Sequence, residues 1–222
     1  MPNIDNFILY WDDFLISLNE TFQMMVVAGL LTLTIGALIG VTIVITQKDG
    51  ILENKYINFI FEGLTNIIWA IPFFILYMML YPLVSMVLGS KSFSVIGAIF
   101  PLVIGTVPFF ARQVVSTLSE VNPGLIEAAQ SMGQSNLQIV FRVYLKESIP
   151  GLARGSAITL VTLFGLTTIA GSFGIGGIGI FVKRYGYDQN MYDILYISVF
   201  VIIVFVFIIQ GIGNYIAKKT TH

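Results

Sequence analysis

The residues best suited to specific contacts lie in one polar segment, 122–152, between two apolar stretches. Within it, Glu127, Ala128 and Ala129 are followed by Gly133. An ordered polar segment of this length between apolar stretches predicts a surface on which another protein docks; an ordinary amphipathic loop is the alternative. An intramembrane hydrolase is disfavoured, because the apolar stretches hold no Asp, Glu, Lys or His that could form a nucleophile–base pair or a carboxylate pair.

Local signals predict two short helices joined by a sharp bend. Asn122 is suited to cap the first helix, and Pro123 fits its first position, where a missing N–H costs nothing. Gly133 is suited to end that helix, and Ser135 with Gln138 forms the pattern of a capping box that opens a second one. The spacing of the apolar residues predicts one stripe along the first helix, made of Leu125, Ile126, Ala129 and Met132.

The composition is that of an integral membrane protein. Of the 222 residues, 56% are hydrophobic and 10% are charged, whereas soluble domains carry about 25% charged residues. The chain has five long stretches without a charged residue, each of at least the roughly 20 residues that a helix needs to cross the membrane: Thr21–Gln47, Gly63–Ser90, Ser92–Ala111, Gly155–Val182 and Ile194–Ala217. They lack strand alternation. We predict an all-α integral membrane protein with five transmembrane helices.

The chain shows no internal repeat, low-complexity tract or long linker, so we predict a single transmembrane domain over residues 1–222. Pro72 and Pro108 lie inside predicted spans and are expected to kink them. Gly36 and Gly40 in the first span have the spacing that permits close helix contact, although glycine is also simply frequent in membrane helices.

The positions of lysine and arginine predict the orientation. With the N-terminus outside, the inner segments hold eight of these residues: Lys48, Lys55, Arg112, Arg142, Lys146, Arg154, Lys218 and Lys219. The outer segments hold the other three of the eleven: Lys91, Lys183 and Arg184. We therefore expect a multi-pass protein with its N-terminus outside, its C-terminus in the cytoplasm and segment 122–152 on the cytoplasmic side.

Several classes of partner and site receive no support from the composition. A net charge of −1 gives no indication of a nucleic-acid partner. The absence of cysteine excludes disulfides and thiolate metal sites, and His222, the one histidine, has no candidate ligand partners. We expect no metal site and no catalytic residue. The acidic N-terminal flank argues against a cleavable signal peptide.

Glycines crowd the end of the fourth apolar stretch, where Gly171, Gly174, Gly176, Gly177 and Gly179 follow one another closely. This density disfavours an uninterrupted helix and favours a re-entrant or loop segment with close backbone approach. A nucleotide-binding glycine loop is the rival interpretation, but no strand precedes the segment.

The segment around Glu127 resembles the signature loop of ABC importer permeases. Glu127, Ala128, Ala129 and Gly133 match the E-A-A-x-x-x-G pattern, and Leu145 matches its later part. The sequence departs from it where Val143 replaces the usual Ile and Lys146 stands where the family usually has Pro, although Pro150-Gly151 could supply the turn. The resemblance implies that this loop, at about 120–150, is a coupling helix seated in a cleft of an ATPase subunit.

Further motifs resemble the methionine uptake family of ABC importer permeases over nearly the whole chain. They are Ile71-Pro72-Phe73, the run from Val107 to Arg112, and the glycine run from Gly171 to Gly179 followed by Lys183 to Tyr187. The resemblance implies a type I permease fold and a permease that moves L- and D-methionine inward across the bacterial plasma membrane by alternating access. It also implies a homodimer embedded in lipid, two cytoplasmic ATPase subunits, and an extracytoplasmic methionine-binding protein or lipoprotein.

By this resemblance, the ATPase-coupling residues are Leu125, Ile126, Glu127, Ala128, Ala129, Met132 and Gly133. Thr168, Ile169 and Ser172 are the candidates for the gate and pathway, with Ile169 at the narrow point, unless it faces lipid or the core. The chain itself is then not an enzyme and holds no cofactor, because ATP and magnesium belong to the ATPase. Arg112 is expected to pair with Glu120 or Glu127, or to reach lipid headgroups.

Other functions stay open at this point. A permease for another amino acid or a small osmolyte would share every motif of the coupling loop. A secondary transporter or a channel would act without an ATPase, but the spans lack the internal charges that usually mark ion or proton paths. Lys183 and Arg184, on the outer side, are expected to meet either an acidic face of the binding protein or lipid headgroups.

Overall fold

The computed structural model describes residues 4–220, and every regular element in that range is a helix. Within it, five helical spans are long and apolar enough to cross a membrane. They are Trp11–Thr46 (α2), Phe73–Phe93 (α4, Phe73–Leu88, with η1, Gly89–Phe93), Val95–Ser119 (α5), Ile149–Ser172 (α9) and Tyr192–Thr220 (α11). The prediction of an all-α protein with five membrane-spanning helices is confirmed. His222 lies outside the described residues.

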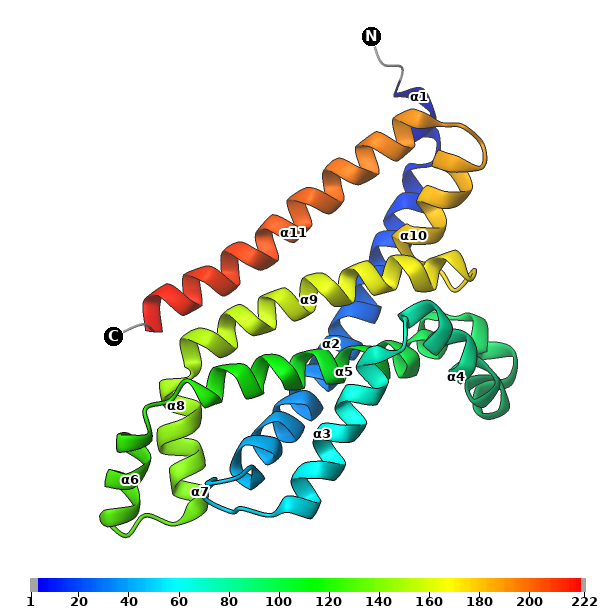
Figure 1. Ribbon diagram of the computed structural model, residues 1–222. Coiled ribbons are helices and arrows are strands. Elements are labelled where there is room, and N and C mark those ends of the chain that lie inside the picture. Colours follow the sequence, from blue (N-terminus) through cyan, green and yellow to red (C-terminus); the bar gives the residue numbers. More distant parts are fainter. Residues whose placement is uncertain (1–3, 221–222) are drawn as a thin grey trace. The chain divides into compact units, whose positions relative to one another are not determined.

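Shorter helices connect these spans (Figure 1). Before and after α2 lie α1 (Asp5–Leu9) and α3 (Lys55–Ala70). Between α5 and α9 lie α6 (Pro123–Ser131), α7 (Asn136–Ile139), the π-helical η2 (Val140–Tyr144) and α8 (Leu145–Glu147). Between α9 and α11 lie α10 (Gly177–Phe181) and the π-helical η3 (Val182–Tyr187).

The second apolar stretch is not one helix, so the expected span Gly63–Ser90 is wrong in its extent. The chain leaves the helix at Ile71, Pro72 adopts φ −55° and ψ 132°, and α4 begins at Phe73. Proline lacks an N–H and disfavours the helical conformation in the residue before it, which explains a break here instead of a kink. By contrast, α5 stays helical through Pro108.

The fourth span also ends earlier than expected, at Ser172 and not at Val182. The chain turns through Phe173–Gly176, where Gly174 has φ +86° and Gly176 has φ +121°. The turn brings Gly179 against α9 so closely that a Cβ there would lie 2.3 Å from the carbonyl oxygen of Thr168. The predicted interruption with close backbone approach is confirmed, although helix α10 follows the turn.

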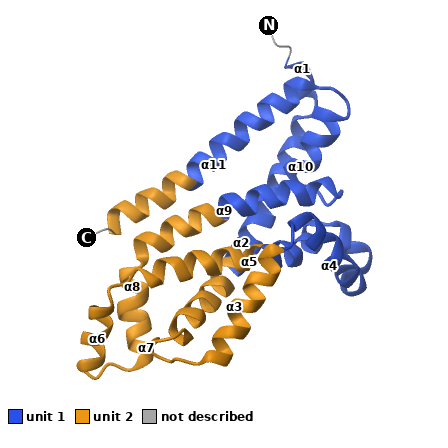
Figure 2. Ribbon diagram, viewed as in Figure 1, with its two compact units in different colours: residues 1–31, 71–105, 160–209 blue, residues 32–70, 106–159, 210–222 orange. Residues whose placement is uncertain are grey.

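The described chain divides into two compact units (Figure 2). Unit 1 comprises residues up to 31, 71–105 and 160–209, and unit 2 comprises 32–70, 106–159 and residues from 210 onward. Four of the five boundaries fall inside α2, α5, α9 and α11, so each of these helices contributes residues to both units, and the fifth lies between α3 and α4. The single domain expected from the sequence stays a prediction.

Small residues let the helices of unit 2 approach closely. On α2, a Cβ at Gly40 would lie 2.6 Å from the Cβ of Val114 on α5, and Gly36 is packed against Phe110. Gly151 on α9 is packed against Thr117 of α5 in the same way. The close contact suggested by the Gly36–Gly40 spacing is confirmed. Such small-residue contacts bring the helix backbones within van der Waals reach of one another.

Candidate functional site

The first helix of the predicted docking segment begins as its sequence indicates. The Oδ1 atom of Asn122 accepts a hydrogen bond from the backbone N–H of Gly124 at 2.9 Å, and Pro123 occupies the first helical position. This arrangement satisfies a donor that the first turn of a helix otherwise leaves without a partner. The start of α6 is therefore determined by residues next to it in the sequence.

Gly133 forms the bend that follows α6, with φ +75°. Its N–H donates to the carbonyl of Gln130 at 2.9 Å, and the next N–H, of Gln134, donates to the carbonyl of Ala129 at 3.1 Å. A residue with a Cβ is strained at such a φ value. A Cβ at this position would otherwise meet no atom within 4 Å, so the constraint on Gly133 comes from the backbone alone.

The second helix opens with the predicted capping box. The Ser135 hydroxyl accepts from the N–H of Gln138 at 3.4 Å, and the Gln138 side chain accepts from the N–H of Ser135 at 2.9 Å. From Asn136 the chain stays helical through η2 and α8 to Glu147, and it turns at Ser148, so the turn precedes Pro150. Lys146, the departure from the family pattern, lies exposed on α8.

The apolar residues of α6 lie on one stripe, as their spacing predicts, but the stripe is only partly buried. Ala129 is buried and Ile126 is half-buried against the core of unit 2, whereas Leu125 is 44% exposed and Met132 71% exposed. At about 100° per residue, Ile126 and Ala129 lie on one edge of the stripe and Leu125 and Met132 on the other. Only one edge faces the core.

The core that holds the segment is formed by residues from distant parts of the chain. Ala129, Ile139 and Tyr144 are buried in a cluster with Val44 of α2 and with four residues of α5 and its C-terminal end, namely Phe110, Val114, Leu118 and Val121. Burial raises the pKa of the Tyr144 hydroxyl. Helices α6 and η2 lie side by side on this core (Figure 1). We call α6 and the helical segment from α7 through η2 to α8 the bent pair. The bent pair is therefore attached to the ends of α2 and α5.

The outer surface of the bent pair carries large apolar side chains that are exposed in the described chain. Besides Leu125 and Met132, these are Leu137 at 71% and Phe141 at 66% exposure, and the central Glu127 and Ala128 are exposed as well. Sequence reasoning missed Leu137 and Phe141, although their spacing of four residues places both on one helical face. A group of exposed large apolar residues is typical of a protein-interaction surface.

The three candidate gate residues lie in the last turns of α9. Ile169 is 36% exposed. The Thr168 hydroxyl donates to the carbonyl of Gly165 at 2.7 Å, and the Ser172 hydroxyl donates to the carbonyl of Ile169 at 2.6 Å. Both hydroxyls thus bond to their own helix, and the gate role of these residues stays a prediction.

Arg112 contacts α3 and forms no ion pair with Glu120 or Glu127, so the expected pairing is wrong. Its Nη1 donates to Oδ1 of Asn66 at 3.2 Å, and its guanidinium carbon lies 4.5 Å from the ring centroid of Trp69. A guanidinium over an indole face is stabilised by the cation–π interaction. Within residues 4–220, no group of three or more acidic or histidine side chains is arranged to hold a metal ion.

Comparison with protein families gives a match over most of the chain. Residues 33–222 match the family described as "Binding-protein-dependent transport system inner membrane component". The probable D-methionine transport system permease protein MetI of Pasteurella multocida is 38% identical over 212 residues, which are 96% of this chain and 97% of that protein. The methionine import system permease protein MetP of Bacillus subtilis is 39% identical over 178 residues, 78% of either chain.

Solved structures give the same result for the fold. A chain in an inward-facing structure of the MetNI methionine ABC transporter superposes with a TM-score of 0.90 at 33% identity, covering 96% of this chain and 98% of that one. A chain of an amino acid ABC transporter crystallised with histidines superposes with a TM-score of 0.80 at 14% identity, which supports the fold alone. The type I ABC importer fold expected from the sequence is confirmed.

Proposed function

Because this chain belongs to the family of binding-protein-dependent transport system inner membrane components, we propose that it is the permease subunit of an ATP-driven importer that moves methionine into the cell. The observation that carries the proposal is similarity at 38% identity over 97% of the length of a methionine permease. Since the relationship extends end to end, the pathway and the docking surface of such a permease both have counterparts here.

We place the ATPase on the bent helix pair, where the residues expected to couple to it are Leu125, Ile126, Glu127, Ala128, Ala129, Met132 and Gly133. Exposed apolar groups on α6, α7 and η2 support this assignment, and we add Leu137 and Phe141 to the expected contacts. Ile126 and Ala129 act from the inner face, where they join the pair to the core of unit 2. The ATPase supplies ATP binding, magnesium and hydrolysis.

Displacement of the bent pair by the ATPase is transmitted through packed contacts. Ala129 and Ile139 are buried against α2 and α5, and Gly40 and Gly151 bring α2 and α9 into close contact with α5. Close-packed interfaces move as units between discrete arrangements because they cannot deform continuously. A shift of the bent pair therefore carries the attached helix ends with it, which is what alternating access requires.

The complete transporter we propose has two copies of this chain, two ATPase subunits and an extracytoplasmic methionine-binding protein or lipoprotein. The chain lies in the plasma membrane with its N-terminus outside and its C-terminus in the cytoplasm, in agreement with the eight inner and three outer basic residues. At the outer part of the pathway, Thr168, Ile169 and Ser172 form the gate.

Uptake by proteoliposomes tests the proposed substrate. The chain is reconstituted with its ATPase, the binding protein is added on the other side of the membrane from ATP, and accumulation of labelled L-methionine is followed. Unlabelled L- or D-methionine should compete, whereas other amino acids and small osmolytes should not. Uptake that unlabelled methionine fails to inhibit, but that another amino acid does inhibit, would assign the chain to a different substrate.

A further inference from the structure

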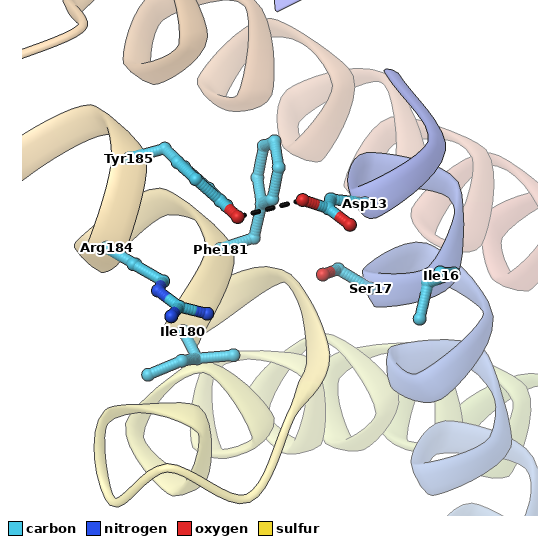
Figure 3. A pocket seen from close by; sticks show the side chains of 7 residues that line it. All are labelled: Asp13, Ile16, Ser17, Ile180, Phe181, Arg184 and Tyr185. Atoms are coloured by element: carbon cyan, nitrogen blue, oxygen red, sulfur yellow. Dashed lines mark hydrogen bonds between the residues drawn. The ribbon is translucent and has the colours of Figure 1, made fainter. Parts of the chain in front are cut away.

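A cavity of about 140 Å³ lies in unit 1, between the first turns of α2 and the helical segment α10–η3. One wall is formed by Asp13, Ile16 and Ser17, and the other by Ile180, Phe181, Arg184 and Tyr185. Figure 3 shows the guanidinium of Arg184 directed from its helix into the space between the two walls. Carboxylate, hydroxyl and guanidinium groups thus meet apolar surface in one concave site, which is the usual composition of a small-molecule site.

The two walls are held in register along their length. The side chain of Glu20 accepts from the N–H of Gly177 at 2.7 Å, and the Thr21 hydroxyl accepts from the N–H of Ile178 at 2.8 Å. Towards the N-terminus of α2, the rings of Phe14 and Phe181 have their centroids 5.5 Å apart. These contacts fix the cavity before any ligand arrives, so a ligand bears little of the cost of ordering it.

The hydroxyl of Tyr185 orients the acidic group of the site. It donates to Oδ2 of Asp13 at 2.8 Å (Figure 3), and this hydrogen bond is the main reason why the pKa of Tyr185 is raised. The ring of Tyr185 is packed against that of Tyr10, with centroids 4.2 Å apart. The bond engages one carboxylate oxygen and leaves Oδ1 of Asp13 without a hydrogen bond from residues 4–220.

The basic group of the site, the guanidinium of Arg184, likewise has donors without a partner among the described residues. The neighbouring Lys183 forms an ion pair with Asp188 at 2.9 Å, but the side chain of Arg184 forms no ion pair or hydrogen bond with any residue in 4–220, including Asp13. Its ring contact with Tyr185 leaves the guanidinium N–H groups available as donors. The cavity therefore presents an acceptor with negative charge and donors with positive charge, and the two do not satisfy each other.

We propose that this cavity binds the zwitterionic head group of an α-amino acid at the end of the permease that carries its N-terminus. The ammonium group meets Asp13 and the Ser17 hydroxyl, the carboxylate meets Arg184, and the side chain lies against Ile16 and Ile180. The volume is close to that of an engineered cavity of about 150 Å³ that holds benzene, and the open side leaves room for a longer side chain. Only the identity of the amino acid, methionine, rests on the proposed function.

A charged pair on the binding protein is the other occupant that these groups could recognise. A small molecule is favoured because the charges line a concave space whose walls also carry the apolar side chains of Ile16 and Ile180, and do not stand on a convex surface. The guanidinium of Arg184 can form charge-assisted hydrogen bonds with the carboxylate of an amino acid, and the carboxylate of Asp13 can form them with its ammonium group.

Calorimetric titration tests the site on the transporter in lipid nanodiscs, with its ATPase present and without ATP or binding protein. The ligands are L-methionine, its methyl ester, which lacks the carboxylate, and N-acetylmethionine, which lacks the ammonium. Each lost charge-assisted contact should weaken binding about tenfold or more. Arg184→Gln should remove the preference over the ester, and Asp13→Asn, which keeps an acceptor for Tyr185, should remove the preference over the acetyl derivative.

Lys183→Gln and Asp12→Asn are the matched controls, because both change an exposed charge next to a cavity residue without lining the cavity. They should bind as the unaltered chain does. Methionine binding that is insensitive to Asp13→Asn and Arg184→Gln would overturn the proposal. A parallel titration with the binding protein, in which the two variants weaken its association and leave methionine binding unchanged, would overturn it as well. Normal methionine uptake without such binding would refute this site alone, whereas binding without methionine uptake would refute the proposed function alone.

Discussion

Replacement of Gly133 by valine should impair transport without removing the protein from the membrane. At φ +75° an L-residue is strained by about 1–2 kcal/mol, and a β-branched one by more. No steric clash adds to this strain, since a Cβ here meets no atom within 4 Å. The buried Ala129 and Ile139 hold the two helices on either side of the bend, so the residues between them must absorb the strain.

A strain of this size changes the population of the bent conformation by a factor of about 5–30. We therefore expect the initial rate of methionine uptake to fall about tenfold at unchanged membrane levels, while the ATPase continues to hydrolyse ATP. The assay compares uptake and phosphate release in the same proteoliposomes. Loss of uptake with hydrolysis retained would mark a failure of coupling.

Gly133→Asn is the matched control, because asparagine enters the left-handed region at lower cost than other residues with a side chain. It should retain uptake within about threefold of the unaltered chain, given that its strain is the smaller one. Wild-type uptake by the valine variant would show that the bend is not required for transport. An asparagine variant as impaired as the valine variant would show that backbone strain is not the cause.

Three further changes have expected results. Gly40→Ala should lower the thermal unfolding midpoint in detergent, because its Cβ would lie 2.6 Å from that of Val114, whereas Gly165→Ala, which meets nothing within 4 Å, should leave it equal or slightly higher. Glu127→Lys should reduce the amount of ATPase that co-purifies with the chain, and equal recovery would contradict the assigned contact. The hydrogen bond to Asp13 raises the pKa of the Tyr185 hydroxyl above the unfolded value of about 10. The contribution of this bond to the free energy of unfolding should therefore be constant from pH 7 to 9 and lost as the pH rises further. Tyr185→Phe should abolish this loss.

Local signals predicted the docking segment because its ends depend on neighbours in sequence. The cap at Asn122, the capping box at Ser135 and the bend at Gly133 each need only residues within a few positions. The five spans were predictable for a similar reason, since length and composition determine which helices can cross a membrane. The break at Pro72 was located in sequence but expected as a kink, because hydropathy does not distinguish a kinked helix from two helices.

Contacts between distant residues could not be predicted in this way. Asp13 and Tyr185 are 172 positions apart, and Glu20 and Gly177 are 157 apart, so no periodicity connects them. Lys183 and Arg184 were expected to act alike, yet one pairs with Asp188 and the other lines the cavity. The apolar residues of α6 were correctly recognised, but which edge of their stripe faces the core depends on tertiary packing.

Single-cysteine cross-linking tests most directly whether the bent helix pair is the contact with the ATPase. The chain has no cysteine of its own, so Leu137→Cys, at a site 71% exposed on α7, can carry a photoactivatable maleimide in the assembled transporter. Leu15→Cys, at a 44% exposed apolar site near the start of α2, is the control. We predict that the probe at position 137 cross-links to the ATPase, in an amount that changes with ATP, and that the probe at position 15 does not. A probe at position 137 that reacts with extracellular reagents, or that never reaches the ATPase, would contradict the proposed coupling.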